Sequence, residues 1–217
     1  MRKIITATFV SLDGVMQSRV GPEEDRVGGF EFGGWTFHYW DDVGGAFIGE
    51  TFAKPFALLL GRKTYDIFAA HWPYQESGPI ADSFNAATKY VATHRPDTLS
   101  WQNSQSLGDD VVATLRQLKQ EDGPDLLIQG SSELIQTLLA NDLIDEISLL
   151  TFPLVLGKGK RLFGSGAIPA AFKLSRSQAS TTGVIMATYQ RAGEIKTGSF
   201  AQEQPSEAEI ERRRTWK

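Results

Sequence analysis

Leu126–Leu127–Ile128–Gln129–Gly130–Ser131–Ser132–Glu133–Leu134–Ile135 sets the architecture of this chain. Its apolar run has the length of a strand and ends at Gly130, and a helical pattern starts directly after that glycine. A second strand-like run begins at Ile144. The pattern therefore predicts a strand–turn–helix–strand unit. The unpaired N–H groups and the dipole at the start of such a helix attract a phosphate.

A second strand that ends at a glycine lies upstream. The apolar run Phe56–Leu60 leads into Gly61–Arg62–Lys63–Thr64–Tyr65, which adds cations and a hydroxyl to the turn. Glycine lets backbone N–H groups approach a phosphate closely, and the planar guanidinium of Arg62 suits phosphate oxygens. Both turns together predict a binding site for a nucleotide with more than one phosphate.

The composition is that of an ordinary soluble protein. The chain has 217 residues, of which 41% are apolar and 22% charged, and this length suits one domain. It contains no cysteine, which excludes disulfides, thiolate metal sites and cysteine nucleophiles. The net charge of −4 argues against a nucleic-acid partner. The histidines His38, His71 and His94 lack ligand spacing, so we expect no metal site.

Hydrophobic runs are short throughout the sequence. No stretch approaches the roughly 18 apolar residues that a membrane-spanning helix needs. Cations stand near the N-terminus, but the apolar run after them breaks at Ser11–Leu12–Asp13–Gly14, too early for a signal peptide. We therefore expect a cytoplasmic protein with no membrane partner.

Apolar runs and helical patterns alternate along the rest of the chain. We expect strands at Ile4–Val10, Phe56–Leu60, Thr88–Thr93, Leu99–Trp101, Asp125–Ile128, Ile147–Phe152, Phe172–Ser180 and Val184–Gln190. We expect helices within Phe37–Phe52, at Lys63–Ala70, Pro79–Ala87 and Asp109–Gln120, and after Gly130. This order predicts an α/β fold: a three-layer sandwich with a central, mainly parallel sheet and a C-terminal antiparallel hairpin.

Three segments outside these elements also carry predictions. Gln17–Gly34 reads as a long loop, a kind that is uncommon unless it is functional. Ser106 with Asp109, and Ser206 with Glu209, have the spacing of a capping box at a helix start. We expect one folded domain at residues 1–191 and a polar tail at residues 192–217, which forms a short surface helix or is disordered.

Five short motifs occur in order between residues 3 and 191. They are Ser11–Leu12–Asp13–Gly14, Gly61–Arg62–Lys63–Thr64–Tyr65, Thr93–His94–Arg95, Gly130–Ser131–Ser132 with Leu143–Ile144–Asp145–Glu146–Ile147, and Pro153–Leu154–Val155–Leu156–Gly157. In this order they resemble the dihydrofolate-reductase-like superfamily. The likeness is greatest to the reductase domain of bifunctional riboflavin-biosynthesis deaminase–reductase proteins, in its free-standing single-domain form. The resemblance implies the fold predicted above, a small-molecule substrate and a homodimer.

The resemblance implies NADPH as the cofactor. A monoester at the 2′ position needs a cation and a hydroxyl, which Arg95 and Thr93 could supply, with His94 as a lesser candidate. The dinucleotide fingerprint G-x-G-x-x-G is absent, which fits this superfamily because it binds the cofactor differently. The implied cofactor-binding residues are Gly61, Arg62, Lys63, Thr64, Thr93, His94, Arg95, Gln129, Gly130, Ser131 and Ser132.

Each of these residues also has a plainer interpretation. Gly61 and Gly130 could be ordinary turn glycines, and Arg62 a solvated surface cation. Thr93 and Arg95 could belong to an ordinary loop. Gly157–Arg161 resembles a phosphate loop but lacks the G-x-x-x-x-G-K-[ST] spacing, so we expect a solvated loop there.

Hydride transfer also needs a proton or a hydrogen bond at the acceptor, and a carboxyl group is the natural donor in this chain. The candidates are Asp13, Asp41 and Asp42, with Glu24 and Asp25 in the long loop. Asp13 could instead cap its own turn. Trp35 and Trp40 are candidates for the substrate-binding wall, and core packing is their alternative role.

Together these features predict an NADPH-dependent reductase acting on a small heterocyclic or ribosylamino-type acceptor, similar to 5-amino-6-(5-phosphoribosylamino)uracil reductase. A dihydrofolate reductase is the first alternative, and a carboxylate facing the pterin pocket would favour it. A catalytically inactive nucleotide-binding or interaction protein is the second, and a pocket filled by Trp35 or Trp40 would favour that. The zinc deaminase signature is absent, so we do not expect the bifunctional enzyme.

Overall fold

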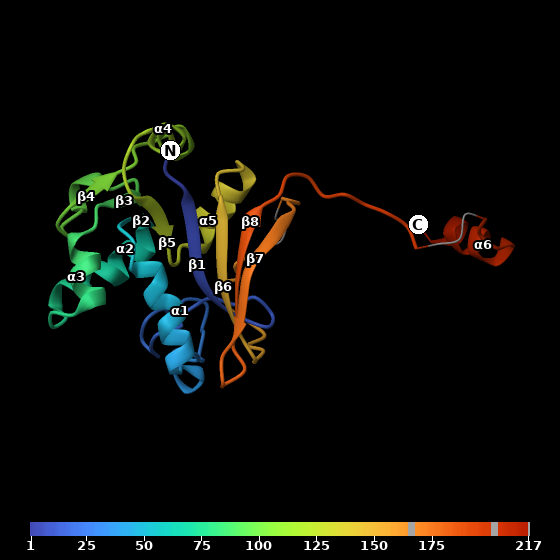
Figure 1. Cartoon of the computed structure of the whole chain (residues 1–217), viewed down its shortest axis with the longest axis horizontal. Helices are drawn as coiled ribbons and strands as arrows, with labels where there is room; N and C mark the ends of the chain where they lie inside the picture. Colours follow the sequence, from blue (N-terminus) through green and yellow to red (C-terminus); the bar gives the residue numbers. More distant parts are fainter. Residues whose placement is uncertain (165–167, 201–203, 217) are drawn as a thin grey trace.

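The computed structural model describes residues 1–164, 168–200 and 204–216 (Figure 1). Its strands are β1 (Ile4–Ser11), β2 (Phe56–Gly61), β3 (Lys89–Ala92), β4 (Ser104–Ser106), β5 (Asp125–Ile128), β6 (Glu146–Phe152), β7 (Phe172–Ala179) and β8 (Ile185–Arg191). Its α-helices are α1 (Asp42–Phe52), α2 (Arg62–Ala69), α3 (Pro79–Ala86), α4 (Val111–Gln120), α5 (Ser132–Ala140) and α6 (Glu207–Thr215). Short 3-10 turns lie at Phe37–Tyr39, Trp72–Tyr74 and Pro96–Thr98.

The strands form one sheet in the order β4-β3-β2-β5-β1-β6-β8-β7. Strands β1 to β6 pair in parallel, whereas β8 runs antiparallel to β6 and β7. The predicted parallel sheet with a C-terminal antiparallel hairpin is confirmed. Because the parallel strands point the same way, the loops after β1, β2, β3, β5 and β6 gather at one edge, where open α/β sheets bind ligands.

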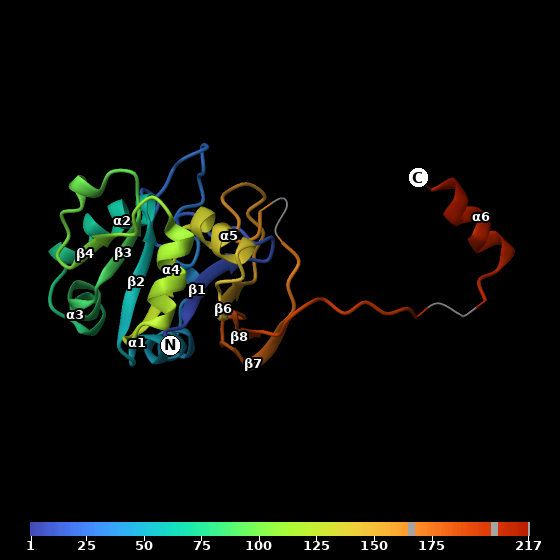
Figure 2. The same ribbon diagram turned by 90° about the horizontal axis from the view of Figure 1, so that it is seen from above.

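Helices cover both faces of the sheet, as the predicted sandwich requires (Figure 2). Strand β2 is buried on both sides: Ala57 and Leu59 pack in one apolar cluster with residues of α4 and α5. Leu58 and Leu60 pack in another with residues of α2 and α3. A third cluster joins α1 to β1, β6 and β8, and it includes Phe9 and Phe152. Burial on both faces explains why the central strands are almost uninterrupted apolar runs.

Two local predictions are wrong. The strand expected at Leu99–Trp101 is instead irregular: Trp101 is buried, and its backbone N–H donates to the Tyr65 hydroxyl at 2.8 Å. The short edge strand is β4, further along the chain. Helix α4 is capped by Asp110, whose side chain accepts from the Ala113 N–H, and not by the expected Ser106–Asp109 box. The Ser106 hydroxyl accepts from the Gly108 N–H in its own turn.

Residues 192–200 run away from the sheet, and the last described helix is α6 (Figures 1 and 2). The capping residue predicted for this helix is confirmed, because the Ser206 hydroxyl accepts from the Glu209 N–H. No residue of α6 is buried. The boundary expected at residue 191 stays a prediction. None of the helices in the described ranges is long and apolar enough to span a membrane.

Candidate functional site

A cavity of about 670 Å³ runs along the carboxyl ends of the parallel strands. Its size is in the range of small-molecule sites. All eleven residues named above as cofactor ligands line it: Gly61, Arg62, Lys63, Thr64, Thr93, His94, Arg95, Gln129, Gly130, Ser131 and Ser132. The fold thus brings together turns that lie far apart in the sequence, after β2, β3 and β5.

The turns after β2 and β5 interlock. The Gly61 N–H donates to the Ser131 hydroxyl at 2.7 Å, and that hydroxyl donates to Thr64 Oγ1 at 2.8 Å. Both glycines lie against the facing turn: a Cβ on Gly61 would lie 3.0 Å from Ser131 Cβ, and one on Gly130 would lie 3.2 Å from Thr64 Cγ2. The glycines are therefore required for close approach of the two turns.

Each interlocked turn starts a helix that faces the cavity. Gly61 is the N-cap of α2, and Ser131 is the N-cap of α5. In α5 the first intrahelical hydrogen bond runs from the Ile135 N–H to the Ser131 carbonyl. The N–H groups of residues 132–134 come before it and therefore have no carbonyl partner within the helix. Residues 132–134 line the cavity, as do residues 62–64 of α2. Two helix N-termini side by side make this part of the cavity attractive to a diphosphate.

Arg62 is committed to contacts within the protein. Its guanidinium lies 2.9 Å from Asp66 Oδ1 and donates to Thr98 Oγ1 at 2.5 Å and to the Arg95 carbonyl at 3.3 Å. It therefore braces the loop after β3 against α2. Besides the two roles expected from the sequence, a phosphate ligand or a solvated cation, Arg62 thus has a third role, that of positioning the loop.

Arg95 is the more available cation at this end of the cavity. Its side chain is 64% exposed and its guanidinium lies 3.9 Å from Asp66 Oδ2, at the limit of an ion pair. Thr93 lies beside it, and its hydroxyl accepts from the Arg95 N–H at 3.0 Å. His94 is exposed on the same loop. A hydroxyl next to an exposed guanidinium fits a phosphate monoester.

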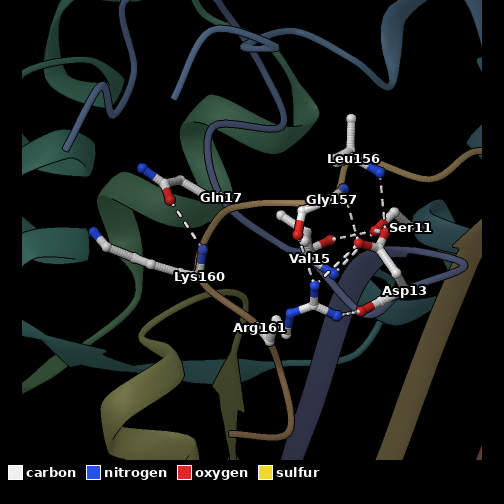
Figure 3. Close-up of polar contacts among 8 residues, drawn as sticks. All are labelled: Ser11, Asp13, Val15, Gln17, Leu156, Gly157, Lys160 and Arg161. Carbon is white, nitrogen blue, oxygen red and sulfur yellow. Dashed lines mark hydrogen bonds and ion pairs between the residues drawn. The ribbon is translucent and has the colours of Figure 1, made fainter. Parts of the chain in front are cut away.

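Asp13 joins two loops at the edge of the sheet (Figure 3). Its carboxylate accepts from the Ser11 hydroxyl at 2.6 Å, the Leu156 N–H at 3.0 Å and the Gly157 N–H at 2.9 Å. Arg161 pairs with it at 3.2 Å. The Ser11 hydroxyl and the two backbone N–H groups lower the pKa of Asp13 from 3.8 to about 2. These contacts keep Asp13 ionised, and it does not belong to the described cavity wall.

The aspartates at the start of α1 lie elsewhere too. Asp41 is the N-cap: its carboxylate accepts from the Gly44 N–H at 2.8 Å and from the Thr181 N–H and hydroxyl at 2.8 and 2.6 Å. The Thr181 hydroxyl and the Gly44 N–H lower the pKa of Asp41. Asp42 is exposed in the first turn of the helix. Neither is among the described residues that line the cavity.

The two tryptophans expected at the substrate wall pack against aromatic rings of β1 and β6. Trp35 is 9% exposed, its indole N–H donates to the Gln17 carbonyl at 2.8 Å, and its ring meets Phe152 edge-on. Trp40 is 46% exposed and stacks on Phe9. Both belong to the region between the sheet and α1, and the described cavity wall includes neither.

Residues of the long loop form the other end of the cavity, and only the carboxylates among them were predicted from the sequence as candidate site residues. Met16, Gln17, Ser18, Arg19, Glu24 and Asp25 line the cavity together with Lys160. Asp25 and Lys160 form an ion pair in which their side chains are 15% and 29% exposed. Gln17 Oε1 accepts from the Lys160 N–H at 2.9 Å (Figure 3). Lys158 is exposed, as expected of a solvated loop, whereas Lys160 is half-buried.

Comparison with known proteins gives the following matches. The profile of the RibD C-terminal domain family matches residues 2–186. The uncharacterized protein YwjB of Bacillus subtilis is 30% identical over 75% of this chain and 83% of its own. The uncharacterized protein YyaP of the same organism is 24% identical over 88% of this chain and 96% of its own.

Solved structures share the fold. A putative riboflavin biosynthesis protein from Shewanella sp. PV-4 superposes with a TM-score of 0.59 at 22% identity, over 88% of this chain and 99% of that one. A diaminohydroxyphosphoribosylaminopyrimidine deaminase/5-amino-6-(5-phosphoribosylamino)uracil reductase from Thermotoga maritima superposes with a TM-score of 0.56 at 14% identity. The match covers 88% of this chain and 57% of that one. Dihydrofolate reductase from Enterococcus faecalis, complexed with NADP(H), superposes with a TM-score of 0.54 at 14% identity. The match covers 87% of this chain and 96% of that one.

Proposed function

The chain belongs to the RibD C-terminal domain family, and from that premise we propose that it is an NADPH-dependent reductase. Its acceptor on this proposal is a small heterocycle or a ribosylamino-type compound. The observation that carries the proposal is the cavity at the carboxyl ends of β2, β3 and β5, lined by every residue that the sequence motifs implicate in cofactor binding.

The residues of the cavity fit such a cofactor. The first-turn N–H groups of α2 and α5 would hold the diphosphate. Gly61 has no side chain to cover these N–H groups, and its close approach to Ser131 leaves no space for one. Thr93 and Arg95 would hold the 2′-phosphate. NADPH would supply the hydride, and the protein positions it.

The order of the strands orients the proposed site. From β3 through β2 and β5 to β1, the cavity passes from the proposed 2′-phosphate site over the two helix N-termini to the loop after β1. The acceptor therefore belongs at the end formed by Gln17–Arg19, Asp25 and Lys160. Among the ionisable groups there, the Asp25–Lys160 pair is the best-placed proton source for the acceptor. It takes that role ahead of Asp13 and Asp41, whose carboxylates are bonded elsewhere, and ahead of Asp42, which is exposed and outside the described cavity lining.

Two alternatives were open. A dihydrofolate reductase would be favoured by a carboxylate facing the pterin pocket: Asp41, at the start of α1, caps the helix instead, and Asp25, at the acceptor end of the cavity, is paired with Lys160. An inactive protein would be favoured by a pocket filled with Trp35 or Trp40, and both pack against other aromatic rings.

A homodimer and a cytoplasmic location remain parts of the proposal. Strand β7 is an edge of the described sheet, and Leu174 and Ile185 on the hairpin are each 49% exposed. Light scattering should give twice the chain mass of 23.9 kDa. A single chain mass would contradict the dimer.

Titration with NADPH and NADH tests the cofactor. Wild type should bind NADPH more tightly, and Arg95→Ala should lose about tenfold to a hundredfold in NADPH affinity with a smaller loss for NADH, since a charge-assisted contact contributes roughly 1.5–3 kcal/mol. Arg116→Ala, an exposed arginine on α4, is the matched control and should bind as wild type does. Absence of binding of either nucleotide would refute the proposal.

A further inference from the structure

Arg19 has an unusual environment at the acceptor end of the cavity. It lines the cavity, and its guanidinium carbon lies 4.0 Å from the centre of the buried Phe9 ring. Within the described ranges its guanidinium makes no hydrogen bond and no ion pair. Other arginines near these loops are paired: Arg26 with Glu23, Arg62 with Asp66, and Arg161 with Asp13.

The lack of a partner is costly for a group in this position. Burial lowers the pKa of the Arg19 guanidinium, and the charge of Glu24 opposes this effect in part. The Glu24 carboxylate itself accepts from the Val20 N–H at 2.7 Å. The neighbouring cation Lys160 is already neutralised by Asp25. A half-buried guanidinium that lies on an aromatic ring and has free donors is stabilised by an anion that enters from the cavity.

The backbone around Arg19 is held from both sides. The Arg19 carbonyl accepts from the Thr36 hydroxyl at 2.7 Å. Ser18, the residue before it, has a left-handed backbone with φ of 53°. Its hydroxyl donates to the Gly21 carbonyl at 2.9 Å and accepts from the Asp25 N–H at 3.1 Å. A non-glycine residue in this conformation is strained, and such strain persists where the surroundings fix it.

We propose that Arg19 forms a subsite for an anionic oxygen group of the acceptor, a carboxylate or a phosphate. The planar donors of a guanidinium match both groups in a bidentate contact. The contact with Phe9 would hold the guanidinium plane while leaving its donors for the ligand. That the bound anion belongs to the acceptor rests on the proposed function. That Arg19 binds an anion does not depend on the proposed function.

Binding of simple anions to the ligand-free protein tests the subsite. Benzoate and inorganic phosphate are titrated separately at constant ionic strength, with chloride as the reference anion, and affinity is read from the rise of the thermal unfolding midpoint. Benzoate should stabilise wild type beyond chloride, and neutral benzamide should not. Arg19→Met, which keeps apolar contact with Phe9, should lose about tenfold or more of the benzoate affinity.

Matched variants separate this site from the others. Arg26→Met, in the same loop and outside the cavity lining, should respond to benzoate as wild type does. Phosphate stabilisation lost in Arg95→Ala would report the proposed cofactor site, and loss in Arg19→Met would report the subsite. Arg19→Lys keeps the charge without the planar donors and should lose part of the affinity; it also serves if Arg19→Met does not fold.

Two results would overturn the proposal. One is an equal benzoate response in wild type and the Arg19 variants, and the other is no stabilisation of wild type by either anion beyond chloride. NADPH affinity, measured in parallel, should be unchanged in Arg19→Met. If NADPH does not bind to any variant, the reductase proposal fails while the anion result still stands.

Discussion

The hydroxyl of Ser131, at the start of α5, accepts a hydrogen bond of 2.7 Å from the backbone N–H of Gly61, at the end of β2. This bond joins two turns that are 70 residues apart in the sequence. It fixes the spacing of the two helix N-termini to which we assign the diphosphate.

Ser131→Ala should lower the free energy of unfolding by about 1–3 kcal/mol, because the Gly61 N–H loses its acceptor and Thr64 loses a donor. NADPH affinity should fall as well, since the spacing of the turns is no longer fixed. Urea unfolding and NADPH titration measure the two effects. Ser177→Ala, at an exposed position on β7, is the control. Equal stability of the two variants would contradict the role given to Ser131.

Gly61→Ala should destabilise the protein by about 1–3 kcal/mol, the usual range for overpacking. The new Cβ would lie 3.0 Å from both Cβ and Oγ of Ser131, which would have to shift. Gly49→Ala, in α1, introduces a Cβ with no atom within 4 Å and should be neutral or stabilising. Calorimetry measures the unfolding free energy of both variants. Equal stability of Gly61→Ala and Gly49→Ala would show that the turn at Gly61 accommodates a Cβ without strain.

Asp13 should make the stability depend on acid pH. Its pKa falls from 3.8 to about 2 in the folded state, so its contribution is present above pH 3.8 and is lost as pH falls through about 2. Its size at neutral pH is about 2 kcal/mol. The difference in unfolding free energy between wild type and Asp13→Asn should therefore be large at pH 6 and nearly absent at pH 2. Asp97→Asn, on an exposed residue, should follow wild type throughout; a constant difference for Asp13→Asn would refute this assignment.

Thr98→Val should weaken NADPH binding severalfold although Thr98 does not line the described cavity. Its hydroxyl accepts from Arg62 and donates to the Arg95 carbonyl at 2.8 Å, so its loss frees the loop that carries Thr93 and Arg95. NADH affinity should change less, because that loop is assigned to the 2′-phosphate. Ser100→Ala, an exposed residue further along the same connection, serves as the control. Unchanged NADPH affinity in Thr98→Val would mean that Arg62 does not position the loop.

Truncation tests the proposed domain boundary. The Ala192 N–H donates to the Ala171 carbonyl at 2.9 Å, and the Ala171 N–H donates to the Gly193 carbonyl at 3.2 Å. A chain ending at Glu194 should keep the wild-type unfolding midpoint, because α6 buries no residue. A chain ending at Arg191 should unfold at a lower temperature. A large loss in both would mean that the tail stabilises the domain.

The parts of the fold that could be predicted are those with local signals. Runs such as Leu126–Ile128 are buried on both faces and therefore continuous, and the glycines after β2 and β5 mark the turns because close approach demands them. Strand β4 was misplaced because Ser104–Ser106 is a polar edge strand of three residues, with no apolar period to reveal it. The apolar Leu99–Trp101 resembles a strand in sequence because Trp101 is buried, but its burial comes from a side-chain cluster with Tyr65 and not from strand pairing.

The lining of the cavity also has a part that local signals predict and a part that they do not. Nucleotide binding stays a prediction, but the cavity end at the turns after β2, β3 and β5 could be predicted because each turn carries its own glycine, hydroxyl or cation. The acceptor end could not, since Lys160 meets Asp25 across 135 residues of sequence and no local pattern marks the pair. The spacing of Arg62 and Asp66, four residues apart on a helix, was a visible signal that Arg62 has a partner.

Gln17 gives the long loop a property that matters for how such proteins diversify. Its amide donates to the carbonyls of Asp25 and Val27 at 3.0 and 2.9 Å, its side-chain oxygen accepts from Lys160, and its own carbonyl accepts from Trp35. One side chain thus connects several segments of the wall at the proposed acceptor end, and none of these contacts involves the turns after β2 and β5. This wall can therefore change independently of the turns after β2 and β5. We expect insertions or deletions at the exposed Gly28–Gly29 to reshape the proposed acceptor end and to leave those turns in place.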